Sequence, residues 1–185
     1  PTGKNKGSKE PLTDYTVDPK STFKIIEKKT RPFLLVSSTS WTPDEDFSLL
    51  LHALILLDQQ ITIEKTESAY KIICIVTGKG PQKALYEEKI KQLKLDHIHI
   101  RTMWLEAEDY PVLLGCADLG VCLHTSSSGL DLPMKVADMF GSGLPVCAVK
   151  FNCIGELIEE NQNGKIFETP AQLCNNLYQL LENPV

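Results

Sequence analysis

From residue 33 onward the chain alternates between short apolar runs and stretches with helical periodicity, and no other feature restricts its fold so strongly. The runs are continuously apolar, which is typical of parallel strands covered on both faces. Strands and helices that alternate at this spacing predict right-handed βαβ units. The expected fold class is therefore α/β, with a doubly wound and mostly parallel sheet.

The same pattern gives the expected elements. The predicted strands are Phe33–Ser37, Lys71–Val76, Ile98–Thr102, Leu119–His124, Pro145–Val149 and a weaker Gly164–Phe167. The predicted helices are Asp44–Leu57, Gln82–Leu93, Asp109–Cys116, Pro133–Phe140, Ile154–Glu160 and Pro170–Glu182. Thr42-Pro43-Asp44-Glu45 has the composition of a helix start, with Thr as cap, Pro in the first turn and Glu three residues after the Thr.

The first residues differ in composition from the rest. Residues 1–22 are rich in Lys, Gly, Pro, Thr and Asp and contain few apolar side chains, which predicts a flexible tail or interdomain linker. Residues 23–185 are long enough for one well-packed domain and short for two. Because the chain begins at Pro1 rather than Met, we expect it to be the downstream part of a longer protein.

Composition argues against several function classes. A net charge of −5 with scattered Lys residues does not predict a nucleic-acid surface. The six Cys include no pair with metal-site spacing, and Cys74, Cys122 and Cys147 lie in predicted strands, so we expect reduced thiols in a cytosol-facing protein and no zinc site. The longest apolar stretch, Leu49–Leu57, is too short for a membrane span.

In a doubly wound sheet, ligands bind beyond the carboxyl ends of the strands, so the loops there are the candidate site. Ser37–Trp41 contains four hydroxyl side chains, which either donate to an anion or cap the following helix. Thr77–Pro81 places two glycines around a Lys; it either approaches a ligand closely or is a plain turn. Trp104 either stacks on a base or packs into the core, and core packing is the preferred interpretation.

The loop after the fourth predicted strand combines more features. Thr125–Gly129 supplies hydroxyls and a glycine, and Pro133 fits the first turn of the next helix. Asp131, Lys135 and Asp138 are spaced i, i+4 and i+7, which predicts one stripe of that helix. Carboxylates accept hydrogen bonds from sugar hydroxyls, and a Lys with helix N–H groups holds a diphosphate. The segment therefore predicts a nucleotide-sugar site.

The rest of this helix bears on the same interpretation. The predicted core-facing stripe consists of Met134, Ala137 and Phe140. The alternative to a ligand site is that Asp131 caps the helix while Lys135 and Asp138 form a surface ion pair of little energetic value.

Several strings carry a family resemblance. Gly143-x-Pro145-Val146, after a helix with a carboxylate, resembles the donor-domain signature of GT-B glycosyltransferases. The string His124–Gly141, together with Ser37–Phe47 and Trp104–Pro111, resembles the chitobiosyldiphosphodolichol β-mannosyltransferases. The resemblance covers about Arg31 to Glu182. It implies the Rossmann-like C-terminal half of a GT-B glycosyltransferase, which is a nucleotide-sugar-binding α/β domain.

The resemblance also implies an activity. Such an enzyme transfers mannose from GDP-mannose to dolichol-diphosphate-linked chitobiose, forming a β-1,4 bond with inversion, on the cytosolic face of the endoplasmic reticulum membrane. We expect the acceptor domain, the membrane anchor and the catalytic base to lie in a missing N-terminal part. This chain alone is then incomplete for activity, and no catalytic residue is assigned within it.

Residue roles follow from the resemblance. It implies that Asp131 binds the mannose hydroxyls, Lys135 the diphosphate and Asp138 the ribose, and that two glycines line the cleft. The expected substrate-binding residues are Ser38, Thr39, Gly78, Gly80, Ser127, Ser128, Gly129, Asp131, Lys135 and Asp138. We expect no cofactor and no metal for donor binding, because a Lys and a helix dipole can supply the positive charge.

The sequence departs from the wider superfamily at two places. Relatives pair two Glu eight positions apart, whereas Asp131 and Asp138 are seven apart, and Ser37–Trp41 replaces the Arg and Lys that many relatives carry after the first strand. One alternative is a truncated non-catalytic paralogue that keeps the fold as a binding or interaction protein. Another is an epimerase-like enzyme, against which the missing Gly-rich fingerprint and Tyr-x-x-x-Lys arrangement argue.

Overall fold

The computed structural model describes residues 13–17, 23–27, 31–64, 71–126, 128 and 130–183. The chain forms two compact units, Pro1–Pro32 and Phe33–Val185. In the first unit, strands β1 (Thr13–Val17) and β2 (Phe23–Glu27) pair antiparallel. The predicted tail at residues 1–22 therefore contains one strand. Its residues 1–12 and 18–22 lie outside the described residues, so its flexibility and its boundary stay predictions.

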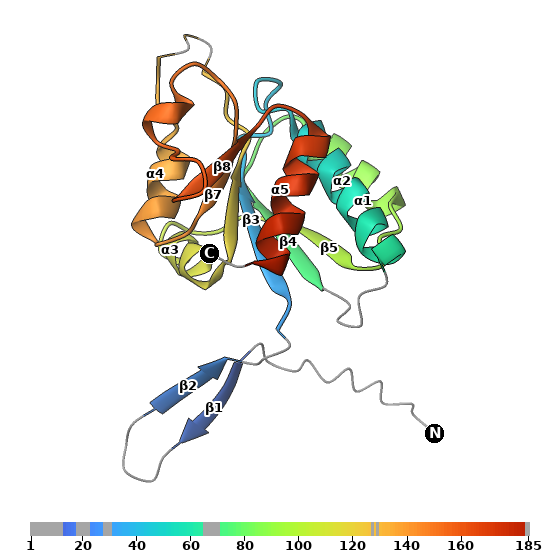
Figure 1. Cartoon of the computed structure of the whole chain (residues 1–185), viewed down its shortest axis with the longest axis vertical. Helices are drawn as coiled ribbons and strands as arrows, with labels where there is room; N and C mark the ends of the chain where they lie inside the picture. Colours follow the sequence, from blue (N-terminus) through green and yellow to red (C-terminus); the bar gives the residue numbers. More distant parts are fainter. Residues whose placement is uncertain are drawn as a thin grey trace. The chain divides into compact units, whose positions relative to one another are not determined.

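The second unit is a doubly wound α/β fold, as predicted (Figure 1). Its elements are β3 (Phe33–Ser38), α1 (Phe47–Glu64), β4 (Ile72–Thr77), α2 (Lys83–Gln92), β5 (Ile98–Met103), α3 (Asp109–Cys116), β6 (Leu119–Cys122), α4 (Met134–Gly141), β7 (Val146–Val149), the 3-10 helix η1 (Ile154–Glu156), β8 (Gly164–Phe167) and α5 (Pro170–Glu182). The six strands are parallel and ordered β5-β4-β3-β6-β7-β8. The chain runs outward from β3 to β5 and then restarts at β6, so the topological switch point lies between β3 and β6.

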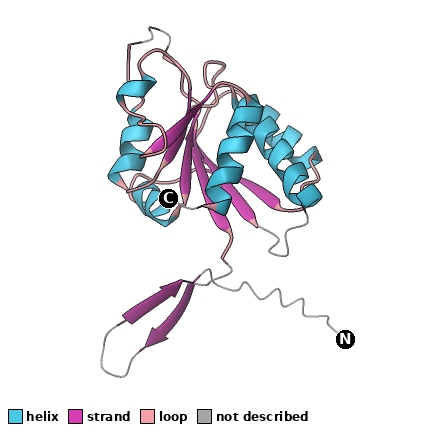
Figure 2. Ribbon diagram, viewed as in Figure 1, coloured by secondary structure: helices cyan, strands magenta, loops and turns pink. Residues whose placement is uncertain are grey.

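Helices cover both faces of the sheet (Figure 2). On β3, Leu35 joins the core under α1, α2 and α5, whereas Leu34 and Val36 join the core under α3 and α4. This alternation follows from the two-residue period of a strand. Because both faces are buried, every residue of the strand is apolar until Ser37, which explains the continuous apolar runs of the sequence.

Helix α1 is the one helix in the described part of the chain with the length and hydropathy of a membrane span, at 18 residues and a mean hydropathy of 1.2. It is nevertheless a core helix, because Leu50, Leu54 and Leu57 are almost fully buried in the core that it shares with α5. The same length and composition occur in core helices of soluble domains.

Both predicted boundaries of α1 are wrong. Helix α1 begins at Phe47 rather than Asp44, and it continues past Leu57 because Asp58, although buried, accepts the backbone N–H groups of Asp96 and His97 at 3.1 and 2.8 Å.

The predicted helix Ile154–Glu160 is only the short η1. The Asn163 side chain accepts a hydrogen bond from the Glu159 N–H at 2.8 Å and donates one to Leu157 O at 2.9 Å. These side-chain bonds replace the backbone hydrogen bonds of a longer helix.

The predicted core face of α4 is wrong at two of its three residues, whereas the third, Phe140, is partly buried and packs against the core as predicted. Val136 and Met139 are fully buried, whereas Met134 is 72% exposed and Ala137 is exposed. The prediction started the helix one residue early, at Pro133, which instead has an extended conformation with ψ 114°. The face toward the core is set by packing on β6 and β7, and periodicity over eight residues did not locate it.

Candidate functional site

A pocket of about 410 Å³ opens at the carboxyl edge of the sheet, beside the switch point. The loops after β3, β4 and β5 form one side, α3 contributes one side chain and α4 contributes two. Its lining consists of Ser38, Thr39, Ser40, Thr77, Gly78, Lys79, Trp104, Leu105, Glu106, Ala107, Tyr110, Lys135 and Asp138. The fold thus brings Ser38, Thr39, Gly78, Lys135 and Asp138 together from the predicted set.

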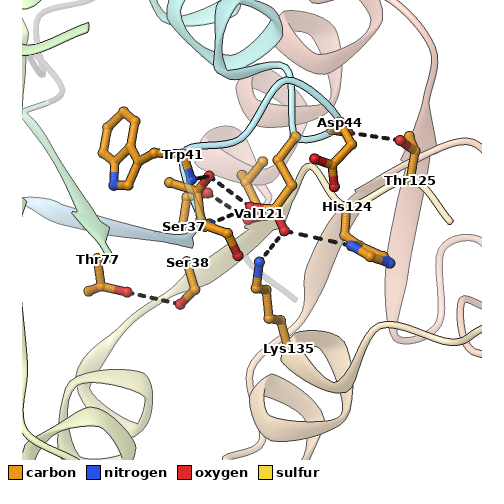
Figure 3. A network of polar contacts seen from close by, with 12 residues as sticks. Ser37, Ser38, Trp41, Asp44, Thr77, Val121, His124, Thr125 and Lys135 are labelled. Carbon is orange, nitrogen blue, oxygen red and sulfur yellow. Dashed lines mark hydrogen bonds and ion pairs between the residues drawn. The ribbon is translucent and has the colours of Figure 1, made fainter. Parts of the chain in front are cut away.

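The hydroxyl side chains after β3 bond to neighbouring elements. The hydroxyl of Ser37 donates to Val121 O at 2.9 Å. That of Ser38 donates to the Tyr110 phenol oxygen at 2.8 Å. It also lies 3.0 Å from Thr77 Oγ1 (Figure 3). Asp46, immediately before α1, accepts the Ser48 N–H at 2.9 Å. The interpretation that the hydroxyls cap α1 is therefore wrong, and anion binding by Ser38 and its neighbours stays a prediction.

Tyr110 adds a donor group to the pocket wall. Burial raises the pKa of its phenol above the ordinary value, although the hydrogen bond from Ser38 opposes the shift. The phenol is therefore protonated at neutral pH, and its O–H is available to a bound ligand.

Glu45 is the centre of the polar network beside the pocket. Its side chain is 2% exposed, and it accepts hydrogen bonds from the Thr39 hydroxyl at 2.8 Å and the Ser40 N–H at 2.5 Å. Lys135 forms an ion pair with the same carboxylate, and His124 Nδ1 lies 3.6 Å from it. Figure 3 shows Lys135 and His124 approaching this network from α4 and from the end of β6.

The charge state of Glu45 follows from these contacts. Burial alone would raise the pKa of this carboxyl, but the hydrogen bonds from Lys135 and Ser40, the Lys135 charge and the Thr39 hydroxyl lower it overall. Glu45 is therefore ionised at neutral pH. The sequence prediction missed it because Thr42–Glu45 has the composition of a capping box, and only tertiary contacts show that the Glu turns inward.

Helix α4 places two of the predicted residues at the pocket. Lys135 and Asp138 lie three residues apart and both line it. Asp131 precedes the helix and is not part of the lining, so the predicted single stripe of three residues is wrong. The ion-pair partner of Lys135 is Glu45 rather than Asp138, which also removes the surface-pair alternative.

Asp131 has its own polar surroundings at the surface. Its carboxylate accepts hydrogen bonds from the hydroxyls of Ser126 and Ser128, and His124 Nε2 lies 3.3 Å from it. The hydrogen bonds from Ser126 and then Ser128 lower the pKa of Asp131 to about 2. The side chain does not cap α4, so the interpretation of Asp131 as a helix cap is wrong.

Asp131 is thus an ionised acceptor beside hydroxyl groups, which suits a polyhydroxylated ligand. The predicted residues Ser127 and Gly129 lie outside the described residues, although they flank Ser128 in the sequence.

The two predicted glycines allow the loop after β4 to approach the loop after β3 closely. A Cβ on Gly78 would lie 1.8 Å from Thr39 O, and one on Gly80 would lie 1.7 Å from Ser40 O. Gly78 also has a φ of +129°, which L side chains rarely adopt. The loop after β4 therefore packs directly on the loop after β3. Gly78 lines the pocket, whereas Gly80 lies against Ser40 and is not part of the lining.

Trp104 lies at the pocket rather than in the core, so the preferred interpretation of this residue is wrong. Its side chain is 50% exposed, and Lys79 Nζ lies 3.8 Å from its ring centroid. The buried tryptophan is Trp41, which is 0% exposed and packs on Phe47 and Tyr86. Trp104 therefore offers an aromatic surface to a ligand.

The described residues contain no group of three or more His, Cys, Asp or Glu side chains placed to hold a metal ion. All six cysteines are free, and burial raises the pKa of Cys74 and Cys147 to about 12. These two side chains are buried neutral thiols, as the predicted strands required.

The chain is similar to a known sequence family and to named proteins. The family model described as "Glycosyl transferases group 1" matches residues 31–183. A protein named UDP-glycosyltransferase TURAN, from Arabidopsis thaliana, is 55% identical over 169 residues, which cover 85% of this chain and 36% of that protein. The human chitobiosyldiphosphodolichol beta-mannosyltransferase is 55% identical over 159 residues, which cover 86% and 34%. The chain thus spans about a third of the length of these relatives.

Solved structures show the same fold at low sequence identity. The crystal structure of Anabaena HepE in complex with UDP matches with a TM-score of 0.64 and 20% identity, covering 82% of this chain and 40% of that one. The C-terminal domain of the group 1 glycosyltransferase LpcC from Francisella tularensis matches with a TM-score of 0.59 and 19% identity, covering 83% and 76%. The compact unit Phe33–Val185 therefore has the fold of a C-terminal glycosyltransferase domain.

Proposed function

The chain belongs to the group 1 glycosyltransferases, and from that premise we propose that it is the donor-binding part of a β-mannosyltransferase that uses GDP-mannose. One observation carries the proposal: a pocket at the switch point combines hydroxyls, a lysine and a carboxylate with an aromatic surface. A nucleotide-sugar requires these groups together. Membership of this family argues against the epimerase-like alternative.

The proposed roles follow the positions of the side chains. Lys135 binds the diphosphate, and Asp138, three residues further along α4, binds the ribose. Asp131, outside the pocket lining, binds mannose hydroxyls together with the Ser126 and Ser128 hydroxyls that it already contacts. Trp104 offers its ring to the base. We propose that donor binding needs no metal or cofactor, because Lys135 supplies the cationic charge.

The activity of the full-length protein is inferred from the relatives. Several are named chitobiosyldiphosphodolichol beta-mannosyltransferase, at 45–58% identity over most of this chain. We propose that the full-length protein transfers mannose to dolichol-diphosphate-linked chitobiose at the cytosolic face of the endoplasmic reticulum membrane. The remaining two thirds of such a protein would supply the acceptor domain, the catalytic base and the membrane anchor.

Calorimetric titration of this chain with GDP, GDP-mannose and UDP tests donor binding. We expect both guanine nucleotides to bind and UDP to bind more weakly. Lys135→Met should weaken GDP binding about tenfold or more, because a charge-assisted hydrogen bond to phosphate is lost. Asp138→Asn should weaken it less, because a ribose contact is lost while the diphosphate contact remains.

The matched control is Lys91→Met, which removes an exposed lysine on α2 that pairs with Glu88 away from the pocket. It should leave GDP affinity unchanged. Binding of UDP in preference to GDP would contradict the proposed donor, and absence of nucleotide binding at millimolar concentration would contradict the donor-domain assignment.

A further inference from the structure

The described lining of the pocket carries as many anionic as cationic side chains. Among its described lining residues the cations are Lys79 and Lys135 and the anions are Glu106 and Asp138. Lys79 lies over the ring of Trp104. Lys135, the cation to which the proposed function gives the diphosphate, already has a carboxylate partner.

That partner, Glu45, is a buried carboxylate beside the pocket. Glu45 is 2% exposed and does not line the pocket, whereas Lys135 does. Its carboxylate is held by the Thr39 hydroxyl and the Ser40 N–H, so it does not depend on Lys135 alone for its position. Because water has little access to it, its negative charge is weakly screened toward a phosphate bound at Lys135.

We propose that Glu45 limits how tightly this pocket holds a nucleoside diphosphate, by neutralising Lys135 and repelling the phosphates bound to it; the inference rests on the proposed donor site. The free diphosphate product has an extra ionisable oxygen compared with the sugar diester, and the second pKa of a phosphate group is about 6. The repulsion therefore acts more strongly on the product than on the donor. Glu45 thereby favours product release, a step that limits turnover in many enzymes.

Two effects compete when Glu45 is replaced by Gln. The amide oxygen still accepts from Thr39 and Ser40, but the buried charge is removed, and Lys135 regains rotamer freedom. Loss of a buried like charge near the diphosphate outweighs that freedom, so we expect E45Q to bind GDP about tenfold more tightly. A purely structural role of Glu45 predicts weaker or unchanged binding.

The test is calorimetric titration of the unaltered chain and E45Q with GDP, GDP-mannose and inorganic pyrophosphate at several salt concentrations. We expect tighter binding of GDP and pyrophosphate to E45Q, a smaller gain for GDP-mannose, and a steeper loss of affinity with salt. The matched control is Glu168→Gln, which also removes the carboxylate of a Lys–Glu pair, with Lys150 at 2.6 Å. It should change none of these affinities.

A second comparison keeps the test valid if E45Q alone folds poorly. Lys135→Met leaves the buried carboxylate unpaired, whereas E45Q/K135M removes both partners, which proteins tolerate better. The double variant should bind pyrophosphate more tightly than K135M. The proposal is overturned if neither E45Q nor the double variant gains affinity over its parent. If the unaltered chain does not bind GDP but the variants gain affinity for pyrophosphate, the proposal of a guanine-nucleotide donor is overturned. The role proposed for Glu45 is then still supported.

Discussion

At the scale of single residues, Glu45 contributes stability that depends on its ionised state. It is buried, and its pKa is lowered by hydrogen bonds from Lys135 and Ser40 in spite of burial. A carboxyl whose pKa is lowered on folding stabilises the protein above its unfolded pKa of about 4.3. That contribution is lost as the pH falls from there through the lower folded pKa.

Replacement of Glu45 by Gln should therefore change the acid dependence of stability. At pH 7 we expect E45Q to lose about 2 kcal/mol in the free energy of unfolding, because Lys135 loses its partner. Below about pH 4.3 the difference should shrink, since protonation removes the same charge from the unaltered chain. Urea unfolding at pH 7, 5, 4 and 3.5 measures both. A difference that stays constant over this range would contradict the ionic contribution.

Glu45 also shows what the sequence alone cannot determine about the site. The fold brings Ser38, Thr39, Gly78, Lys135 and Asp138 together at the pocket because residues after strand ends meet at one sheet edge, and their binding of a substrate stays a prediction.

The contacts of Glu45, Tyr110 and Trp104 depend instead on how separate loops pack. The loop after β4 touches Thr39 and Ser40 only because two glycines admit it. No spacing within the sequence carries that information.

At the scale of elements, the six strands of the parallel sheet were predicted within about two residues, because a continuous apolar run marks a strand buried on both faces. The antiparallel strands β1 and β2 were not predicted. The start of α1 was predicted at Asp44 rather than Phe47, because two neighbouring segments before this helix can each supply a cap. Thr42 with Glu45 fits a capping box, yet Asp46 accepts the Ser48 N–H at 2.9 Å. Glu45, the Glu of that capping-box pattern, instead pairs with Lys135 and accepts a hydrogen bond from the loop after β3.

Substitution at the two candidate caps distinguishes them. Asp46→Ala should lower the free energy of unfolding by about 1 kcal/mol, because the Ser48 N–H loses its acceptor. Thr42→Ala should change it by less than about 0.5 kcal/mol, because the structure assigns Thr42 no cap of α1. Chemical denaturation of both variants at pH 7 provides the comparison. An equal or larger loss for Thr42→Ala would restore the predicted cap.

At the scale of the whole molecule, the described buried core lies entirely within the second compact unit. Both clusters draw their residues from Leu34 to Leu181, on the two faces of one six-stranded sheet. The match to group 1 glycosyltransferases begins at residue 31. A domain of this size buries enough apolar surface to fold alone.

A chain that begins at Arg31 should therefore fold and bind as the full chain does. We expect its thermal midpoint to stay within about 2 °C, because the truncation removes no described core residue. Its GDP affinity should also be unchanged, since every residue of the pocket lies at or beyond Ser38. Scanning calorimetry and titration of the two chains side by side test this. A lowered midpoint with intact GDP binding would assign residues 1–30 a stabilising role, whereas lost binding would extend the donor site into the first unit.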